Sequence, residues 1–356
     1  MVVAMSGGVD SAVAAGLLVR QGYDVVGITM RLWTVEDPDA PAARKRCCSI
    51  EDTDDARAAA DVLGIPHYVL NMEREFQDRV VTYFVDEYAR GRTPNPCLAC
   101  NEHVKFRALL DRAVALDAAF LATGHYARID RHGGRYRLRR AIDDAKDQSY
   151  VLYTLGQAEL ARTLFPVGDC AKPRIREIAR EMRLPLADKP DSADICFVPD
   201  GDHRAFIRRR LPQAAGVVRD ASGAVVGEHD GVAGYTIGQR RGLGVATGEK
   251  RFVTAIDPAL NIITVGREED LLAQALLVER VNWLAGAPPP PGARLHAKIR
   301  YRTAAAPATV TPLPDGGARV AFDAPQRAIT PGQAAVFYDG DEVVGGGAIL
   351  RAERPA

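Results

Sequence analysis

Short apolar runs alternate with segments of helical periodicity over the first 125 residues. The runs at 2–5, 25–30, 66–70 and 118–123 predict strands. Apolar positions at helical spacing predict helices over 11–22, 52–63 and 103–116, and glycine follows the last periodic residue of the first two. Strands separated by helices indicate an α/β fold with a doubly wound parallel sheet, in which ligands bind at the carboxyl ends of the strands.

The pattern changes near residue 200. An arginine-rich helix predicted over 203–211 gives way to short alternating strands and glycine turns, without long helices. The proline run at 287–292 is the clearest linker-like stretch, but the apolar run at 276–278 indicates that the last domain begins before it. We therefore predict a parallel-sheet domain over 1–202, a small central α+β domain over 203–275 and a C-terminal β-barrel over 276–356.

Composition limits where the protein can act and which partners it can bind. The chain has 356 residues, 47% of them hydrophobic, and no apolar run approaches the ~20 residues of a membrane span. No signal peptide precedes the first strand, so we expect a cytoplasmic protein; a few residues are expected to precede this strand in the full chain. The 46 basic and 46 acidic residues cancel, so a polyanionic partner must be bound by a local basic patch.

Residues 6–11 read Ser-Gly-Gly-Val-Asp-Ser and lie between the first strand and the first helix. Gly7 and Gly8 allow positive φ and close approach of a ligand, and the first amides of the helix point at an anion. The motif lacks the lysine of GxxxxGK[ST], so its charge complement must come from backbone dipoles, a magnesium ion held by Asp10 or distant basic residues. Ser6, Met30, Gly124 and His125 fall at strand ends and should therefore line one crevice.

This motif resembles that of the PP-loop ATP pyrophosphatases, which generally cleave ATP between the α and β phosphates and adenylate a substrate. The resemblance implies that ATP and Mg²⁺ are cofactors. It also implies ATP contacts at Ala4, Met5, Ser6, Gly7, Gly8, Val9, Asp10, Ser11, Met30 and Gly124.

The cysteines of a cytoplasmic chain indicate reactivity or metal binding before structural disulfides. Cys47 and Cys48 are adjacent and rarely bridge each other; metal binding and simple burial remain open for them, and we favour burial. Two prolines stiffen 93–97, and a helix predicted to begin near residue 101 puts Cys100 close to its N-terminus, where the dipole favours a thiolate. Structural zinc is disfavoured because no second CxxC or His pair has matching spacing. Taken alone, Cys196 is typical of a buried thiol.

A series of motifs runs in a fixed order along essentially the whole chain: SGGVDS, TPNPC with Cys100, TGHYA, KDQSY, LFPVG, DSADICF, YTIGQRRGLG, IRYR and PGQ. In this series the chain resembles the tRNA-specific 2-thiouridylases of the MnmA type. The resemblance implies replacement of the C2 oxygen of the wobble uridine, U34, by sulfur. ATP adenylates that oxygen, sulfur arrives as a cysteine persulfide, and AMP and pyrophosphate leave.

The resemblance also implies roles for individual residues. Cys196 matches the persulfide cysteine, and Cys100 matches the second thiol that breaks the sulfur–sulfur bond. An isolated histidine is usually structural, but the place of His125 in TGHYA makes it a tRNA contact. The implied partners are tRNA carrying U34 and a sulfur donor, either a cysteine desulfurase or a sulfur-relay protein, and we expect a monomer. The implied tRNA contacts are Asn95, Pro96, Cys97, His125, Lys146, Asp147, Gln148, Arg300, Tyr301 and Gln333.

One position departs from the family, because many members have Asp where this chain has Cys97. A third thiol weakens a general-acid role there and strengthens the competing mechanism, in which Cys97, Cys100 and Cys196 hold an iron–sulfur cluster. Another PP-loop tRNA-modifying enzyme, or an amidotransferase-type synthetase, remains an alternative. So does a tRNA-binding or redox-sensing protein with a degenerate nucleotide site, although the intact SGGVDS motif argues against it.

Overall fold

The computed structural model describes residues 1–33, 50–191, 195–198, 201–212, 214–245 and 249–354; Cys47 and Cys48 lie outside them. The first domain contains a parallel sheet in the order β3-β2-β1-β4-β7. Its order reverses between β1 and β4, which is where ligands bind in such sheets. Its strands are β1 (Val2–Ala4), β2 (Val26–Arg31), β3 (His67–Asn71), β4 (Leu121–Thr123) and β7 (Thr163–Leu164).

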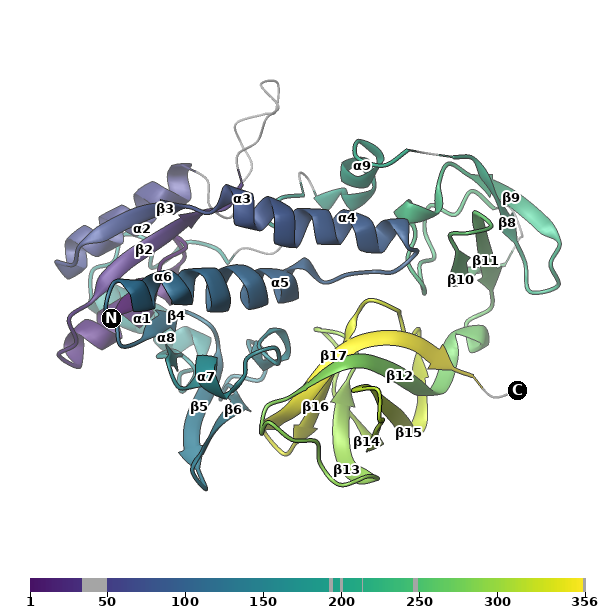
Figure 1. Ribbon diagram of the computed structural model, residues 1–356. Coiled ribbons are helices and arrows are strands. Elements are labelled where there is room, and N and C mark those ends of the chain that lie inside the picture. Colours follow the sequence, from purple (N-terminus) through teal and green to yellow (C-terminus); the bar gives the residue numbers. More distant parts are fainter. Residues whose placement is uncertain (34–49, 192–194, 199–200, 213, 246–248, 355–356) are drawn as a thin grey trace.

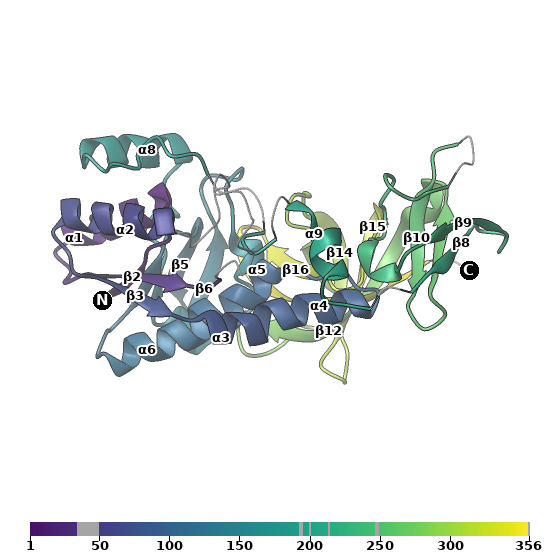
Figure 2. The same cartoon turned by 90° about the horizontal axis from the view of Figure 1, so that it is seen from above.

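Helices cover both faces of this sheet (Figure 2). Successive β1 residues alternate between two cores: Val2 belongs to one and Val3 to the other. This alternation is the period-2 geometry of a strand that is buried on both faces. On one face lie α1 (Val9–Arg20), α2 (Ile50–Leu63) and α8 (Lys172–Glu181). The other carries two long helices, α3-η1-α4 (Glu73–Phe76, Gln77–Val81, Thr82–Ala89) and α5-η2-α6 (Pro96–Ala99, Cys100–Leu109, Leu110–Ala115).

The predicted strands and the parallel sheet are confirmed, but two helices begin earlier than expected. Helix α1 begins at Val9, within the glycine motif. The helix expected near residue 101 begins at Pro96, because Asn95 caps it by accepting a hydrogen bond from the Cys97 amide (3.0 Å). Cys100 therefore lies a turn inside the helix and not at its N-terminus, so the dipole argument for this thiol was wrong.

The central domain has a four-stranded sheet in the order β10-β11-β8-β9. Its core consists of buried apolar residues of these strands, Val218, Val253, Ile263 and Val265 among them. The arginine-rich helix is confirmed as α9 (His203–Arg208). The strands are β8 (Gly216–Arg219), β9 (Val225–His229), β10 (Phe252–Asp257) and β11 (Ile262–Gly266), with the short helices η5 (Val232–Gly234) and η6 (Glu269–Leu271).

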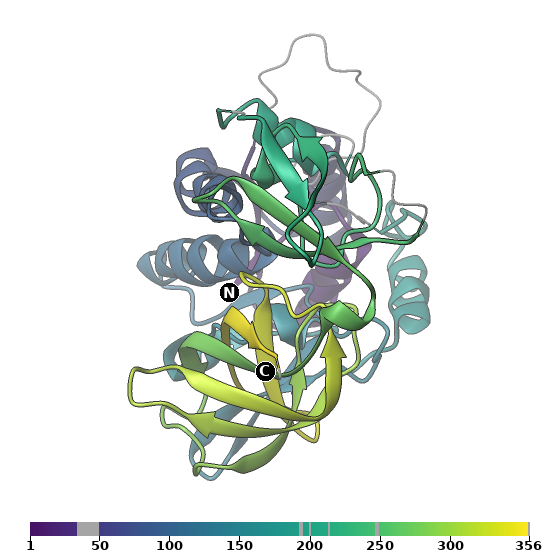
Figure 3. The ribbon, with the colours of Figure 1, turned by 90° about the vertical axis from the view of Figure 1, so that its right-hand side faces the viewer.

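The C-terminal strands form a β-barrel that closes where β12 pairs antiparallel with β17. Figure 3 shows the barrel below the central domain, both in front of the parallel-sheet domain. No helix in the described part of the chain has the length and apolar character that crossing a membrane requires. The barrel strands are β12 (Leu272–Trp283), β13 (Ala293–Lys298), β14 (Ala306–Pro312), β15 (Ala318–Arg327), β16 (Ala334–Asp339) and β17 (Glu342–Glu353).

A hairpin of the first domain joins the barrel sheet (Figure 1). It consists of β5 (Ala127–His132) and β6 (Arg135–Arg140), and β6 pairs with β17 at Glu342. Asp341 accepts hydrogen bonds from Arg128 (2.7 Å) and Arg139 (2.8 Å), one from each hairpin strand. The barrel is thus fixed to the domain that carries the glycine motif. Between hairpin and α8 lie η3 (Ser149–Val151) and α7 (Gln157–Leu160).

We expect Asp341→Ala to increase amide hydrogen exchange in β5 and β6 by at least about threefold. The substitution leaves two guanidinium groups without their shared carboxylate at this junction. Asp323→Ala is the matched control, because Asp323 and its exposed partner Arg294 both belong to barrel strands and not to the junction. Unchanged exchange in the hairpin of Asp341→Ala would show that the ion pairs do not hold the junction.

Candidate active site

Hydrogen bonds made by its own serines hold the loop after β1 in one conformation. Ser11 donates its hydroxyl to the Gly8 carbonyl (2.9 Å), and its oxygen accepts the Ser6 amide (3.1 Å). Gly8 caps α1 without a side chain, so no side chain satisfies the first amides of this helix. The loop therefore presents amide donors and the positive end of a 12-residue helix, as an anion site requires.

Two glycines allow the elements around this loop to pack closely. Gly7 has φ +71°, and a Cβ built on it would lie 2.2 Å from the Asp52 carbonyl oxygen in the first turn of α2. Gly124 follows β4, and a Cβ there would lie 2.6 Å from the Ser11 amide nitrogen. Both positions therefore exclude any larger residue, and the predicted strand ends meet at this loop.

Asp10 is bound by two side chains from distant parts of the chain. The Lys172 ammonium donates to both carboxylate oxygens (2.7 and 2.9 Å), and Tyr126 donates its hydroxyl to Oδ1 (2.7 Å). Burial, followed by the Asp10 charge, raises the pKa of Tyr126, so the phenol keeps the proton that it donates. Lys172 is buried, with 8% of its surface exposed, although it belongs to the basic helix that the sequence predicts.

A second lysine, Lys189, contacts the loop itself. Its ammonium donates to the Gly7 carbonyl (3.0 Å) and to the carboxylates of Asp52 (2.7 Å) and Asp55 (2.5 Å) on α2. The sequence left the charge complement of the motif open, and these two lysines are distant basic residues of the required kind. Nothing in their spacing could have indicated them, since both lie more than 160 positions downstream of the loop.

The loop opens onto a cavity of about 1240 Å³ that also reaches Cys97, Cys100 and Cys196. Cys97 is exposed, Cys100 is buried and Cys196 is half-buried. Next to Cys196, the buried Phe197 ring packs edge-on against Phe76 and Phe84 (centroids 5.6 and 5.3 Å). This aromatic cluster fixes Phe197, the residue next to Cys196. One cavity therefore contains both the glycine loop and three thiols.

Most sequence-predicted residues line this cavity. They include all of 4–11, Met30 and Gly124, together with Pro96, His125, Lys146, Asp147, Gln148 and Tyr301. Asn95 does not line it, because its side chain caps α5. Five cations of the wall are not among the sequence-predicted site residues, and they come from four different parts of the chain: Lys105, Arg140, Lys189, Lys298 and Arg302.

Some predicted tRNA contacts also hold the structure together. The buried Asp147 carboxylate accepts the Ala141 and Ser149 amides (3.2 and 3.1 Å), and the Gln148 side chain accepts the Tyr126 amide (2.9 Å). His125 is buried against Phe106 and Phe165, and this burial holds its pKa well below the usual value. His125 is therefore neutral, and its Nδ1 lies 2.7 Å from the Thr123 hydroxyl.

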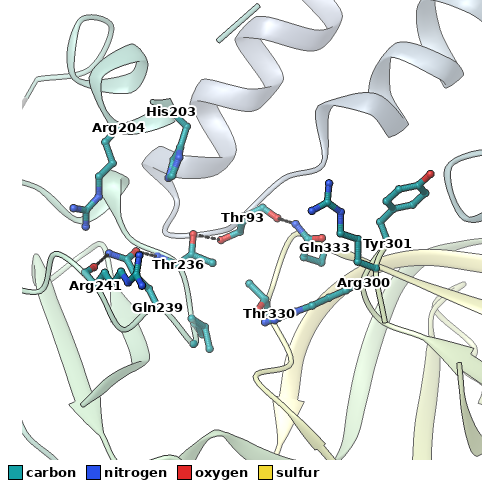
Figure 4. Close-up of a pocket in the computed structure, with 13 residues that line it drawn as sticks. Thr93, His203, Arg204, Thr236, Gln239, Arg241, Arg300, Tyr301, Thr330 and Gln333 are labelled. Atoms are coloured by element: carbon teal, nitrogen blue, oxygen red, sulfur yellow. Dashed lines mark hydrogen bonds between the residues drawn. The ribbon is translucent and has the colours of Figure 1, made fainter. Parts of the chain in front are cut away.

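Arg300 and Gln333 lie elsewhere, in a second cavity of about 740 Å³ between the three domains (Figure 4). Gln333 donates to the Thr93 carbonyl (2.9 Å), and the Thr93 hydroxyl donates to Thr236 of the central domain (3.2 Å). Arg300 donates to the Ala328 carbonyl (2.6 Å). Tyr301 lines both cavities. The structure therefore separates two of the ten predicted tRNA contacts from the thiols.

The side chains of this site suit one of the two metal groups that the sequence suggests, a magnesium ion, and not the other, an iron–sulfur cluster. Magnesium is usually bound through one or two carboxylates together with substrate phosphates, and Asp10, 29% exposed at the cavity wall, fits that chemistry. Among the described residues, no three His, Cys, Asp or Glu side chains are grouped so that they could hold a metal ion. As they lie in this structure, the three cysteines do not fit an iron–sulfur cluster.

The fold and the loop together define a nucleotide-binding domain of the HUP class. A family model described as "tRNA methyl transferase HUP domain" matches residues 1–200. Models described as "tRNA methyl transferase PRC-barrel domain" and "Aminomethyltransferase beta-barrel domain" match 204–267 and 273–349. These matches confirm the predicted three-part architecture: a parallel-sheet domain, a small middle domain and a C-terminal barrel.

Curated relatives identify the family more narrowly. The chain is 48% identical over 355 residues to a tRNA-specific 2-thiouridylase of Pelotomaculum thermopropionicum, covering 98% of this chain and 96% of the relative. It is 51% identical over 351 residues to the one of Moorella thermoacetica, covering 98% of each. The relative of Heliobacterium modesticaldum is 50% identical, with 99% and 92% covered. The chain belongs to the tRNA-specific 2-thiouridylase family.

Gly124→Ala is expected to weaken ATP binding at least about tenfold, equivalent to about 1.4 kcal/mol. The new methyl group would lie 2.6 Å from the Ser11 nitrogen and 2.7 Å from the Asp10 carbonyl carbon, which displaces the first turn of α1. Equilibrium binding of a non-hydrolysable ATP analogue measures the effect. Gly156→Ala is the control, since its methyl group would meet only the Glu159 carboxylate, at 3.0 Å. Wild-type binding by Gly124→Ala would contradict the site.

Proposed function

We propose that this protein catalyses ATP-dependent 2-thiolation of the wobble uridine, U34, of tRNA. The observation that carries the proposal is the single cavity in which an anion-binding glycine loop, two candidate reactive thiols and a cationic wall meet. An ATP site alone fits many enzymes, and a thiol pair alone fits many others. Their juxtaposition fits a reaction that activates an oxygen and then replaces it with sulfur.

Activation begins at the loop of residues 6–11. The uridine C2 oxygen attacks the α phosphorus of ATP, the bond to the β phosphate breaks, and pyrophosphate leaves. The α1 amides supply positive charge where the leaving group gains negative charge. Lys189, paired with Asp52 and Asp55, holds the Gly7 carbonyl of the same loop. A magnesium ion held by Asp10 and the phosphates would neutralise the pyrophosphate further. The oxygen thus becomes part of an AMP leaving group.

Sulfur transfer uses the two thiols. A donor protein loads Cys196 as a persulfide, whose terminal sulfur attacks uridine C2 and releases AMP. The Cys100 thiolate then attacks the Cys196 sulfur, which forms a Cys100–Cys196 disulfide and frees 2-thiouridine. A cellular thiol reductant must reopen this disulfide before the next cycle. Cys100 is buried inside a helix and Cys196 is half-buried in a packed segment, which suits a resolving thiol and a thiol that must meet its donor.

Recognition of tRNA rests on local charge, because the chain as a whole is neutral. Lys146 and Arg302 on the cavity wall, with Arg300 in the second cavity, suit contacts to phosphates near a flipped U34. Asn95, Cys97, His125, Asp147, Gln148, Tyr301 and Gln333 stay predicted tRNA contacts. We expect the protein to act as a cytoplasmic monomer that takes sulfur from a cysteine desulfurase or relay protein.

Cys196→Ser is expected to abolish thiolation while ATP and tRNA binding remain within about twofold of wild type. Serine cannot carry a persulfide, whereas the loop and the cationic wall are unchanged. Mass spectrometry of nucleosides from reacted tRNA measures 2-thiouridine. Cys170→Ser is the control, because Cys170 does not line the cavity and should thiolate normally. Full thiolation by Cys196→Ser would refute the persulfide role.

Asp10→Ala should reduce tRNA-dependent ATP–pyrophosphate exchange at least about 100-fold, or about 2.7 kcal/mol. The change removes the carboxylate at the first turn of α1 and leaves the buried Lys172 beside the phosphates without this counter-ion. Radiolabelled pyrophosphate incorporated into ATP is the readout. The exposed Asp86 on α4 provides the control variant, Asp86→Ala. Undiminished exchange in Asp10→Ala would remove the loop from the mechanism.

A further inference from the structure

Asp191 joins three cations from separate parts of the first domain. Its carboxylate accepts from Lys146 (2.7 Å), Lys172 (2.8 Å) and Arg176 (3.2 Å). Burial opposes the charge, but the hydrogen bonds from Lys146 and Lys172 outweigh it and lower the pKa of Asp191 to about 2. Asp191 is therefore ionised throughout the physiological range, and it lies five positions before Cys196.

Through Lys172, this carboxylate is connected directly to the glycine loop. The buried Lys172 ammonium lies between Asp191 (2.8 Å) and Asp10 (2.7 Å), so one cation is shared by two carboxylates. Lys146, on the other side of Asp191, belongs to the wall that we propose for tRNA. A continuous chain of ion pairs thus runs from Asp10 through Lys172 and Asp191 to Lys146.

The residues just before Asp191 are held against the same loop. Lys189 donates to the Gly7 carbonyl (3.0 Å), and Arg176 of α8 donates to the carbonyls of Ala187 (2.9 Å) and Lys189 (3.0 Å). Beyond Cys196, Phe197 is fixed in its aromatic cluster. The described residues on either side of Cys196 are therefore each held in place, Lys189 at the ATP loop and Phe197 in the core.

Stability alone accounts poorly for this arrangement. The Asp191 and Lys146 side chains are 35% and 39% exposed, and partly exposed ion pairs of this kind add little net stability. Their contribution is a defined geometry, since each charged partner tolerates few positions of the others. Here the geometry that is defined is the position of Asp191, five residues before Cys196, relative to Asp10.

We propose that Asp191 is a positioning residue for sulfur transfer. Its ion pair with Lys172 holds the start of the Cys196 segment on the ATP loop, next to the contact that Lys189 makes with the Gly7 carbonyl. This inference rests on the proposed function and deepens it. It requires that the activated uridine and the sulfur meet only when Cys196 is held at a fixed place beside the loop. Asp191 lines the same cavity as the loop and the thiols, and the role proposed for it is exercised through its ion pairs with Lys172 and Lys146.

The test uses Asp191→Asn in the full-length protein. Asparagine keeps the size of the side chain but removes the charge that the three cations share. We expect thiolation to fall at least about tenfold while tRNA-dependent ATP–pyrophosphate exchange stays within about threefold of wild type. Asp191→Glu restores the carboxylate and should recover a substantial part of the thiolation. A purely structural role would lower both steps together.

Asp188→Asn is the matched control. Asp188 lies three positions earlier, its side chain is 80% exposed, and it pairs with Arg180 (2.7 Å) on the surface. This variant should thiolate and exchange pyrophosphate like wild type, with the same midpoint of thermal unfolding. Equal losses in Asp188→Asn and Asp191→Asn would overturn the proposal, as would wild-type thiolation by Asp191→Asn or parallel loss of both steps.

A second readout separates this inference from the proposed function. The rate at which iodoacetamide alkylates Cys196, followed by mass spectrometry of its peptide, reports the position of the segment without any turnover. We expect Asp191→Asn to change this rate at least about threefold and Asp188→Asn to leave it unchanged. If wild-type protein makes no 2-thiouridine, the proposed function fails, whereas an unchanged alkylation rate in Asp191→Asn overturns the positioning role itself.

Discussion

The packing of Gly7 and Gly124 is the constraint on which the rest of this structure depends. Neither position has room for a Cβ, because the backbone of α2 presses on one and the first turn of α1 on the other. This contact brings the ends of β1 and β4 together at the point where the strand order reverses. The anion-binding amides, Asp10 and the cavity then follow from the topology of the sheet.

Charge at the site is set by pairs formed over long distances in the sequence. The chain is neutral as a whole, yet Lys172 contacts Asp10 and Lys189 contacts Gly7 of the glycine loop, each bound by carboxylates. These carboxylates hold the lysines in place before any ligand binds, so little reorganisation is needed when phosphates arrive. A glycine motif that lacks its own lysine can therefore still bind a polyphosphate.

The sequence predicted those parts of the site that lie in short contiguous motifs. Ser6 to Ser11 indicated an anion loop, and strand ends placed Met30 and Gly124 beside it, because strand period and glycine chemistry are local properties. The helix start at Pro96 was missed, although Asn95 and the proline are a capping signal that could have been used. The earlier start puts Cys100 inside the helix.

Other features were beyond sequence reasoning for a physical reason. Lys172, Lys189 and Asp191 matter through ion pairs with residues up to 162 positions away, and no periodicity encodes such contacts. The hairpin β5–β6 joins the barrel through Asp341, which composition could not indicate. Likewise, Gln333 lies in the second cavity because it binds Thr93, two positions before Asn95, the residue that caps α5.

The most direct test of this account follows the oxygen that is replaced. tRNA carrying ¹⁸O at C2 of U34 is converted by the full-length protein with ATP, magnesium and a persulfide donor, and the AMP is analysed by mass spectrometry. Adenylation of the uridine oxygen predicts one ¹⁸O atom in the phosphate of each AMP and one 2-thiouridine per AMP. Unlabelled AMP accompanied by 2-thiouridine would contradict activation of the base at the glycine loop.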